Sequence, residues 1–119
     1  MALAQVGKVD VFMSTTDTLL QGGGEKVLID ISLENNIPIL SSNKSGIEAG
    51  STFGPVSDFF VLGKMSGEMA AQILKDNVQP AALQSKTQDP PLVLINKESA
   101  QKLGITVLED SFTNFSYVN

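Results

Sequence analysis

The first half of the chain alternates short apolar runs with a segment of helical period. Residues 9–13 and 37–41 are rich in β-branched and aromatic side chains, which is the pattern of buried strands. Around residues 24–35 the apolar residues recur at helical spacing, while the charged residues, beginning with Glu25, fall mostly on a wet face. The apolar positions are Leu20, Val27, Leu28 and Ile31. The pattern predicts two parallel strands joined by a right-handed helical crossover.

A third strand and a second helix follow. Residues 51–54 predict a short strand, and a helix begins after a cap at Ser57 or Asp58 and ends near residue 76. Small residues form a narrow ridge on this helix, and two of them, Gly63 and Gly67, each cost a helix about 1 kcal/mol relative to alanine. We therefore expect close packing against a neighbouring backbone. The apolar stripe consists of Leu62, Met65, Met69 and Ile73.

The remaining third of the chain starts with a proline-rich passage. Residues 78–91 hold three of the five prolines and show no helical period, which is typical of a linker, and residues 83–87 are a candidate strand within it. Beyond it, the pattern predicts a strand at 92–95 and a helix over 97–103 that Asn96 caps and Gly104 ends, and it leaves 109–119 unassigned.

The order of these elements carries a resemblance to a known family. Four stretches resemble the closing third of the solute-binding proteins of ABC transporters: KVDVFMSTTD, IPILSSNKSGIEAGSTFGPVSDFFVLG, SGEMAAQIL and LVLINKESAQKLGITV. Within that family the chain is similar to the branch proposed to carry amino acids such as tryptophan or tyrosine. The resemblance runs without gaps over nearly the whole chain, and it rests on several weak signals in the right order.

The resemblance implies an α/β fold, a three-layer α/β/α lobe on a parallel sheet like that of type I periplasmic binding proteins. Residues 1–56 would form the βαβ part of the second lobe, and 57–119 a lobe-crossing helix, a linker and the terminal strand and helix. A family member needs two lobes, whereas 119 residues bury one core, so we expect a carboxy-terminal portion. Its open strand edge and apolar surface predict a homodimer.

Composition and charge narrow the function classes. The 8 Lys and Arg residues are dispersed and the net charge is −5, whereas nucleic acid binding needs clustered cations. The absence of His and Cys excludes imidazole catalysis, Ser-His-Asp and Cys-His pairs, and zinc sites of the usual kind. We therefore expect neither an enzyme nor a resident cofactor. We find no apolar run of the ~20 residues that span a bilayer, and no leader peptide, although the resemblance places the parent protein outside the cytoplasmic membrane.

Three polar segments that follow predicted strands provide a candidate site. Open parallel sheets bind ligands beyond the carboxyl ends of their strands, where these segments arrive. A carboxylate such as Asp17 accepts from an ammonium group, and hydroxyls and amides bind a carboxylate, which suits an amino acid or similar zwitterion. The same residues also suit ordinary turns and helix caps, and both interpretations stay open. The resemblance implies that the ligand is bound by Thr16, Asp17, Ser42 and Asn43 and, with less weight, by Thr18 and Asp58.

As a function, the resemblance implies the solute-binding component of an ABC importer, whose two lobes close around a small molecule and dock on a membrane permease. Thr15 and Thr18 stand where the family often has Pro and Asn, which allows a different solute. Phe53 and Phe59 are candidate stacking partners for an aromatic solute, with core packing as the other interpretation. The alternative function is the effector-binding domain of a sugar-type transcription regulator, which needs a helix-turn-helix upstream.

Overall fold

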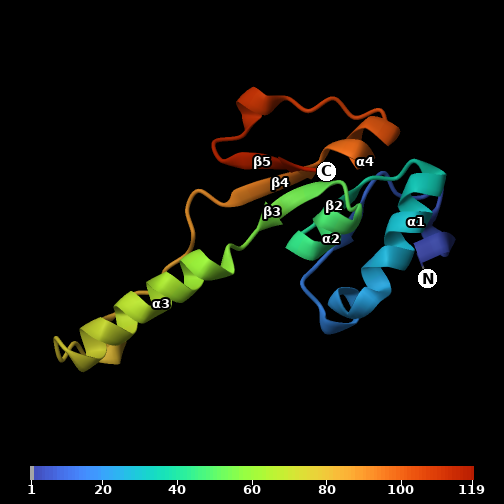
Figure 1. The fold of residues 1–119 in the computed structure, drawn as a ribbon. Coiled ribbons are helices and arrows are strands. Elements are labelled where there is room, and N and C mark those ends of the chain that lie inside the picture. Colours follow the sequence, from blue (N-terminus) through green and yellow to red (C-terminus); the bar gives the residue numbers. More distant parts are fainter. Residues whose placement is uncertain (1) are drawn as a thin grey trace.

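Both halves of the chain contribute strands to one sheet. A computed structural model describes residues 2–119 (Figure 1), so Met1 of the predicted first segment lies outside the described residues. β1, β2 and β3 are parallel, β4 runs antiparallel to β3, and β5 is parallel to β4. The α/β class and the parallel strand–helix–strand unit are confirmed. Within the described residues the five strands lie in chain order: β1 (Phe12–Ser14), β2 (Ile39–Ser41), β3 (Phe53–Val56), β4 (Leu92–Asn96) and β5 (Phe115–Val118).

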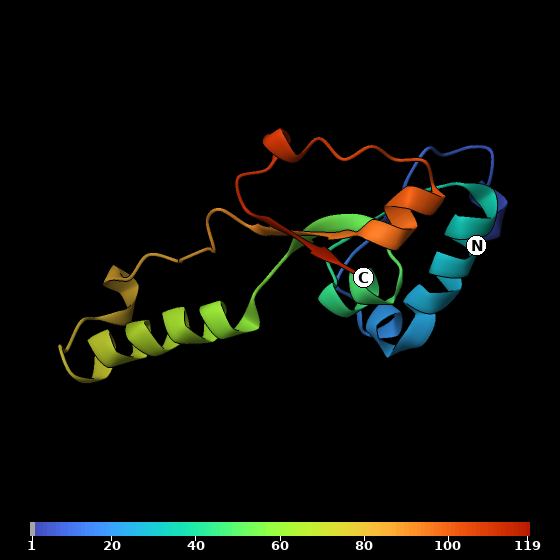
Figure 2. The ribbon, with the colours of Figure 1, turned by 45° about the horizontal axis from the view of Figure 1, so that its top comes forward.

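Helices cover both faces of this sheet, as the predicted three-layer arrangement requires. α1 and α2 lie on one face, and α4 with the 105–112 segment lies on the other (Figures 1 and 2). Among residues 2–119, no helix has both the length and the apolar character needed to span a lipid bilayer. The α-helices are α1 (Glu25–Asn35), α2 (Lys44–Ala49), α3 (Phe59–Leu74) and α4 (Lys97–Lys102).

The apolar core lies on both sides of β4. On the α2 side, Ile47 packs with Val56 and Leu94. On the α4 side, Ile95 and Ala100 are buried. Successive side chains of a strand point to opposite faces, and both faces of β4 are covered, so its sequence LVLIN is a continuous apolar run.

Helix α1 buries a different face from the predicted one. Its buried residues are Glu25, Ile29 and Ser32. Val27, placed on the apolar stripe by its spacing, is 61% exposed. The preceding turn at 20–24 is of π type, and Gly23 within it adopts a φ of 114°, so Leu20 and α1 do not share one helical phase. The helix ends at Asn36, which is left-handed with a φ of 55°.

Several boundaries differ from the predictions. β1 begins at Phe12 and not at residue 9, because its partner β2 starts only after Pro38, which has no N–H for the ladder. The third strand covers 53–56 and not 51–54. The prediction of a strand at 83–87 is wrong, since these residues form no strand. Residues 109–119, which the pattern left unassigned, contain β5.

Three predicted helix caps are confirmed. Asp58 Oδ1 accepts from the backbone N–H of Phe60 and Val61 at the start of α3. Asn96 Oδ1 accepts from the N–H of Ser99 at the start of α4 in the same way. Gly104, with a φ of 67°, ends that helix.

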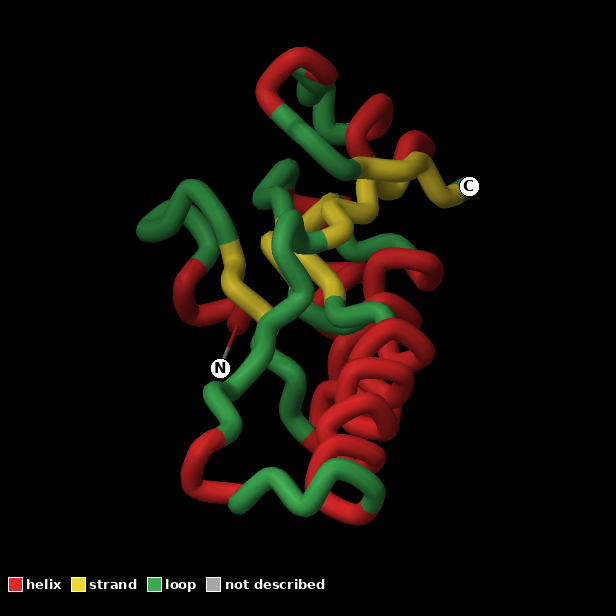
Figure 3. The backbone as a smooth tube through the Cα atoms, turned by 90° about the vertical axis from the view of Figure 1, so that its left-hand side faces the viewer, coloured by secondary structure: helices red, strands yellow, loops and turns green. Residues whose placement is uncertain are grey.

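Helix α3 projects away from the sheet, and segment 75–91 returns beside it (Figures 1 and 3). None of its residues is buried, and Phe60 is 83% exposed. The radius of gyration is 17.7 Å, against about 13.5 Å for a compact chain of this length. The predicted close packing of Gly63 and Gly67 is not made within the chain, because a Cβ at either position would meet nothing within 4 Å.

Tyr117 on β5 links the end of the chain to the 3₁₀ turn at Glu109–Ser111. Its hydroxyl donates to Glu109 Oε1 at 2.8 Å, and this hydrogen bond to a carboxylate raises the pKa of Tyr117 above its ordinary value. Because the folded-state pKa is raised, the contact stabilises the protein below the pKa of an unfolded tyrosine, about 10. The contribution is lost as the pH rises through the folded-state pKa.

This contact predicts a titration that absorbance can follow. Tyr117 is the only tyrosine and the chain has no tryptophan, so phenolate absorbance reports on this one group. We expect Glu109→Gln to move the titration midpoint down toward the ordinary tyrosine value. The control Asp110→Asn, at the neighbouring carboxylate, should leave the midpoint in place. Equal midpoints for the unsubstituted chain and Glu109→Gln would contradict the contact.

Candidate functional site

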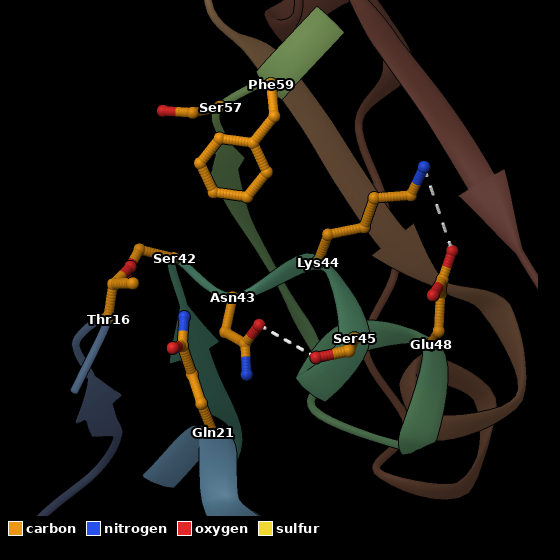
Figure 4. A pocket seen from close by; sticks show the side chains of 9 residues that line it. All are labelled: Thr16, Gln21, Ser42, Asn43, Lys44, Ser45, Glu48, Ser57 and Phe59. Atoms are coloured by element: carbon orange, nitrogen blue, oxygen red, sulfur yellow. Dashed lines mark hydrogen bonds and ion pairs between the residues drawn. The ribbon is translucent and has the colours of Figure 1, made fainter. Parts of the chain in front are cut away.

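A cavity of about 520 Å³ lies at the carboxyl ends of the three parallel strands (Figure 4). Thr16 follows β1, Ser42 and Asn43 follow β2, and Ser57 follows β3. These segments meet because parallel strands end at the same edge of a sheet. The other residues that line the cavity are Gln21, Lys44, Ser45, Glu48 and Phe59.

The loops after β1 and β2 form one polar wall of this cavity. The hydroxyls of Thr16 and Ser42 are hydrogen-bonded at 2.9 Å. The N–H of Ser42 donates to the carbonyl oxygen of Ser14 at 3.1 Å, which ties the start of the second loop to the end of β1. Two of the predicted site residues therefore touch each other, although 26 positions separate them.

Asn43 lies mostly beneath this wall and is 8% exposed. Its Oδ1 accepts from Ser45 Oγ at 2.9 Å, and its Nδ2 donates to Glu25 Oε2 at 2.8 Å. The side chain is thus held in place from two sides.

Asp17, Thr18 and Asp58 do not line the cavity. Asp17 Oδ1 accepts from the backbone N–H of Leu19 at 2.8 Å and of Leu20 at 3.4 Å, as a cap for the turn that follows. Asp58 caps α3, and Thr18 is exposed. For both carboxylates the geometry matches the capping interpretation that the sequence left open. A ligand-binding role for the six predicted residues remains a prediction.

Two opposite charges stand at the cavity rim on helix α2. Lys44 Nζ lies 4.0 Å from Glu48 Oε1, and both side chains are about half exposed (Figure 4). Exposed ion pairs of this kind contribute little to stability, so either group can turn to a ligand at small cost. Neither residue is among the six predicted to bind the ligand, and both lie on α2, which begins at Lys44.

Of the two candidate stacking residues, only Phe59 reaches the cavity. It is 75% exposed, and its ring faces the loop that follows β2 (Figure 4). Phe53 instead lines an apolar cavity of about 260 Å³, with Ile95 and Phe112. The core interpretation therefore suits Phe53 and does not suit Phe59.

Glu25 was also missed, because its position in α1 suggested the wet face. It is 3% exposed, and its Oε1 accepts from Ser41 Oγ at 2.6 Å and from Ser51 Oγ at 2.7 Å. Its Oε2 accepts from Asn43. A signal was present in the sequence: Ser41 shares a face of β2 with the buried Ile39, where an apolar residue is ordinary.

Sequence comparison decides the family. Residues 2–114 match the family described as ABC transporter substrate binding protein. The chain belongs to this family. The resemblance read from the sequence is thereby confirmed, and the family is described by the binding of a substrate and not by a reaction.

The chain is similar to proteins of Clostridioides difficile and Streptococcus pneumoniae. It is 27% identical over 113 residues to the tyrosine-binding protein of Clostridioides difficile (strain R20291), a match that covers 95% of the chain and 32% of the relative. Among solved structures it resembles an ABC domain in complex with L-Trp from Streptococcus pneumoniae, with a TM-score of 0.75 and 26% identity over 99% of the chain and 40% of that structure.

A second solved structure supports the fold alone. It is the ligand-free, open form of a substrate-binding protein with adhesive properties from Clostridium difficile, with a TM-score of 0.76 and 24% identity. The match covers 99% of this chain and 39% of that one. The chain therefore spans about a third of the length of the curated relative and about two fifths of these solved structures.

Proposed function

We propose that this chain supplies one wall of the solute site of an ABC importer's binding protein, with an amino acid or similar zwitterion as the solute. The observation that supports it is the cavity at the strand ends, where hydroxyls, an amide, a cation, a carboxylate and an aromatic ring stand together. The L-Trp complex of a similar structure and the tyrosine-binding relative support the choice of solute class.

Each part of an aromatic amino acid has a matching group at this wall. The hydroxyls of Thr16 and Ser42 and the ammonium of Lys44 suit the solute carboxylate. The carboxylate of Glu48 suits its ammonium group. The exposed ring of Phe59 offers a face on which an aromatic side chain can stack.

A second lobe would complete the site, and the open face of the cavity and the projecting α3 support this arrangement. In this proposal residues 1–56 belong to the lobe described here, and 57–91 cross to the facing lobe before the chain returns to the sheet. Ligand pockets bury most of a ligand's surface, so closure of two lobes is needed for tight binding. The closed protein would deliver its solute, outside the cytoplasmic membrane, to a permease.

The exposed apolar surface of α3 supports a further expectation, that the isolated chain forms a homodimer. Phe59, Phe60 and Leu74 are each at least 75% exposed. Burying such side chains against a second copy removes apolar surface from water. Sedimentation equilibrium at micromolar concentration should give twice the 12.6 kDa of one chain. A monomer would contradict the expectation.

The proposed site is tested by titrating the isotopically labelled chain with L-tryptophan and L-tyrosine and following backbone amide signals by NMR. We expect shifts of Thr16 and of residues 42–45, with a Kd on the order of 1 mM, since one wall alone supplies only about 4 kcal/mol. Replacing Lys44 by Met, which keeps the length but removes the charge, should weaken binding several-fold.

Two matched ligands serve as controls. Tryptamine lacks the carboxylate, and N-acetyl-L-tryptophan lacks the ammonium group, so each should bind more weakly than L-tryptophan at a site built for a zwitterion. If tryptamine binds as well as L-tryptophan, or if the shifts lie only around the apolar cavity of Phe53 and Phe112, the proposed function fails.

A further inference from the structure

A buried carboxylate lies behind the wall of the proposed site. Glu25, the first residue of α1, does not line the cavity, yet it accepts hydrogen bonds from both sides of the cavity-lining Ser42. Ser41 donates to its Oε1 at 2.6 Å and Asn43 donates to its Oε2 at 2.8 Å. Ser42, one of the cavity-lining residues, is thus flanked by two residues fixed to the same carboxyl group.

The carboxyl group of Glu25 is held by three neutral side-chain donors. Three side-chain donors share the two oxygens of Glu25, and a carboxylate is an acceptor only, so no donor of its own is left without a partner. Neither ion pair of the described residues, Lys44 with Glu48 or Lys102 with Glu98, involves it. Hydrogen bonds to a charged group are stronger than those between neutral groups.

The neighbouring Gly46 leaves room for this carboxylate. A Cβ at Gly46 would collide with the carboxyl atoms of Glu25, so an alanine there would force the carboxylate to move. The loop is also fixed within itself, because Ser41 Oγ accepts from the N–H of Asn43 at 3.1 Å, and Asn43 Oδ1 accepts from Ser45 Oγ. A displacement of Glu25 is therefore transmitted to Ser45, which lines the cavity.

We propose that Glu25 is the positioning residue of this binding wall: its carboxylate holds Ser41 and Asn43 and thereby sets the geometry of residues 42–45. This inference rests on the proposed function in one respect: it expects solute binding to weaken when the contacts of Glu25 with Ser41 and Asn43 are lost. The geometry of the wall can be measured without a solute, so the two proposals can fail separately.

Two buried serines form a matched pair for the test. Ser41 and Ser51 are both fully buried and both donate to Glu25 Oε1, at 2.6 and 2.7 Å. Of the two, only Ser41 is adjacent in sequence to the cavity-lining residues, which begin with Ser42. If Glu25 positions the wall, Ser41→Ala should weaken L-tryptophan binding at least about fivefold, because it removes the contact that joins the wall to Glu25. Ser51→Ala should lower the Tm but leave binding within about twofold.

The same variants are compared without solute by amide hydrogen exchange. The readout is the N–H of Ser42, whose partner, the carbonyl oxygen of Ser14, none of the substitutions alters. Ser41→Ala should speed its exchange about tenfold, and Ser51→Ala should change it far less, since exchange follows the local opening of the loop.

Exchanging the donor and the acceptor between Glu25 and Asn43 tests whether a restored hydrogen bond also restores binding. Asn43→Asp alone places two carboxyl groups about 2.8 Å apart in a buried site, where like charges repel strongly. Adding Glu25→Gln restores one donor and one acceptor, with the direction of the hydrogen bond reversed. We expect the single variant to lose binding and speed the exchange of Ser42, and the double variant to recover most of both.

Equal effects of Ser41→Ala and Ser51→Ala on binding and exchange, or a double variant that regains its Tm but neither binding nor slow exchange, would overturn the positioning role. If Asn43→Asp fails to fold, the serine pair still decides. If the unsubstituted chain does not bind L-tryptophan, the proposed function fails, and the exchange of Ser42 still supports or overturns the role of Glu25.

Discussion

Replacing Gly54 by alanine should destabilise the protein by about 3 kcal/mol or more, because overpacking a buried site beside rigid backbone is among the costlier single changes. Gly54 is buried in β3, and a Cβ there would collide with the carbonyl oxygen of Ser41 and lie 2.8 Å from its carbonyl carbon. Relief requires β2 and β3 to separate, since the obstacle is backbone. Urea unfolding followed by circular dichroism measures the loss.

The matched control is Gly63→Ala in α3. A Cβ at Gly63 meets nothing within 4 Å, and alanine is the better helix former by about 1 kcal/mol. This variant should unfold at the same urea concentration as the unsubstituted chain or a higher one. A Gly54→Ala variant that unfolds at the same concentration as Gly63→Ala would show that the β2–β3 contact is looser than described.

Truncating Ile47 to alanine should cost about 3 kcal/mol, the usual range for removing a large buried aliphatic side chain. Ile47 has no exposed surface and packs with Val56 and Leu94. It is also the apolar anchor of α2, a helix of six residues that carries Lys44 and Glu48 at the cavity rim. We therefore expect Ile47→Ala to weaken L-tryptophan binding as well as stability.

A graded series and an exposed control test this interpretation. Ile47→Val removes one methylene group and should cost about 1 kcal/mol. Val27→Ala on α1 removes a side chain that is 61% exposed and should change the free energy of unfolding by less than about 0.5 kcal/mol. If Ile47→Ala costs no more than Val27→Ala, the α2 side of the sheet does not hold the main core.

The parts of the fold that depend on neighbours in sequence were predictable. Asn36 ends α1, Asp58 and Asn96 cap α3 and α4, and Gly104 ends α4, because each relies on a short polar side chain or on permissive backbone within a few residues. The parallel arrangement of β1, β2 and β3 follows from short apolar runs separated by helices.

The misses have non-local causes. The burial of Glu25 depends on donors at positions 41, 43 and 51, so no periodicity within α1 reveals it. The strand β5 pairs with β4 across a connection that includes α4, and its own residues alternate only weakly. The residue spacing on α3 predicted an apolar stripe and a ridge of small residues. Whether another surface covers them cannot be read from the spacing, and within this chain no residue of α3 is buried.

The candidate site was predictable in its location and less so in its membership. Strand ends placed Thr16, Ser42 and Asn43 at one edge, and the cavity is there. Lys44 and Glu48 on α2 line the cavity without being among the predicted site residues, and Asp17 and Asp58 are occupied as caps. Sequence indicates which loops converge, whereas the hydrogen-bond partners within each loop decide which side chains remain available.

The antiparallel pairing of β3 and β4 has a consequence for how the chain is divided. The chain leaves the sheet after Val56 and re-enters it at Leu92, and these two residues are direct partners in the register. Segment 57–91 is therefore, in topological terms, an insertion at the tip of a β-hairpin. The length or sequence of this segment can change without altering the path of any strand of the sheet. The projecting segment 57–91 and the sheet with its covering helices can therefore vary independently in evolution.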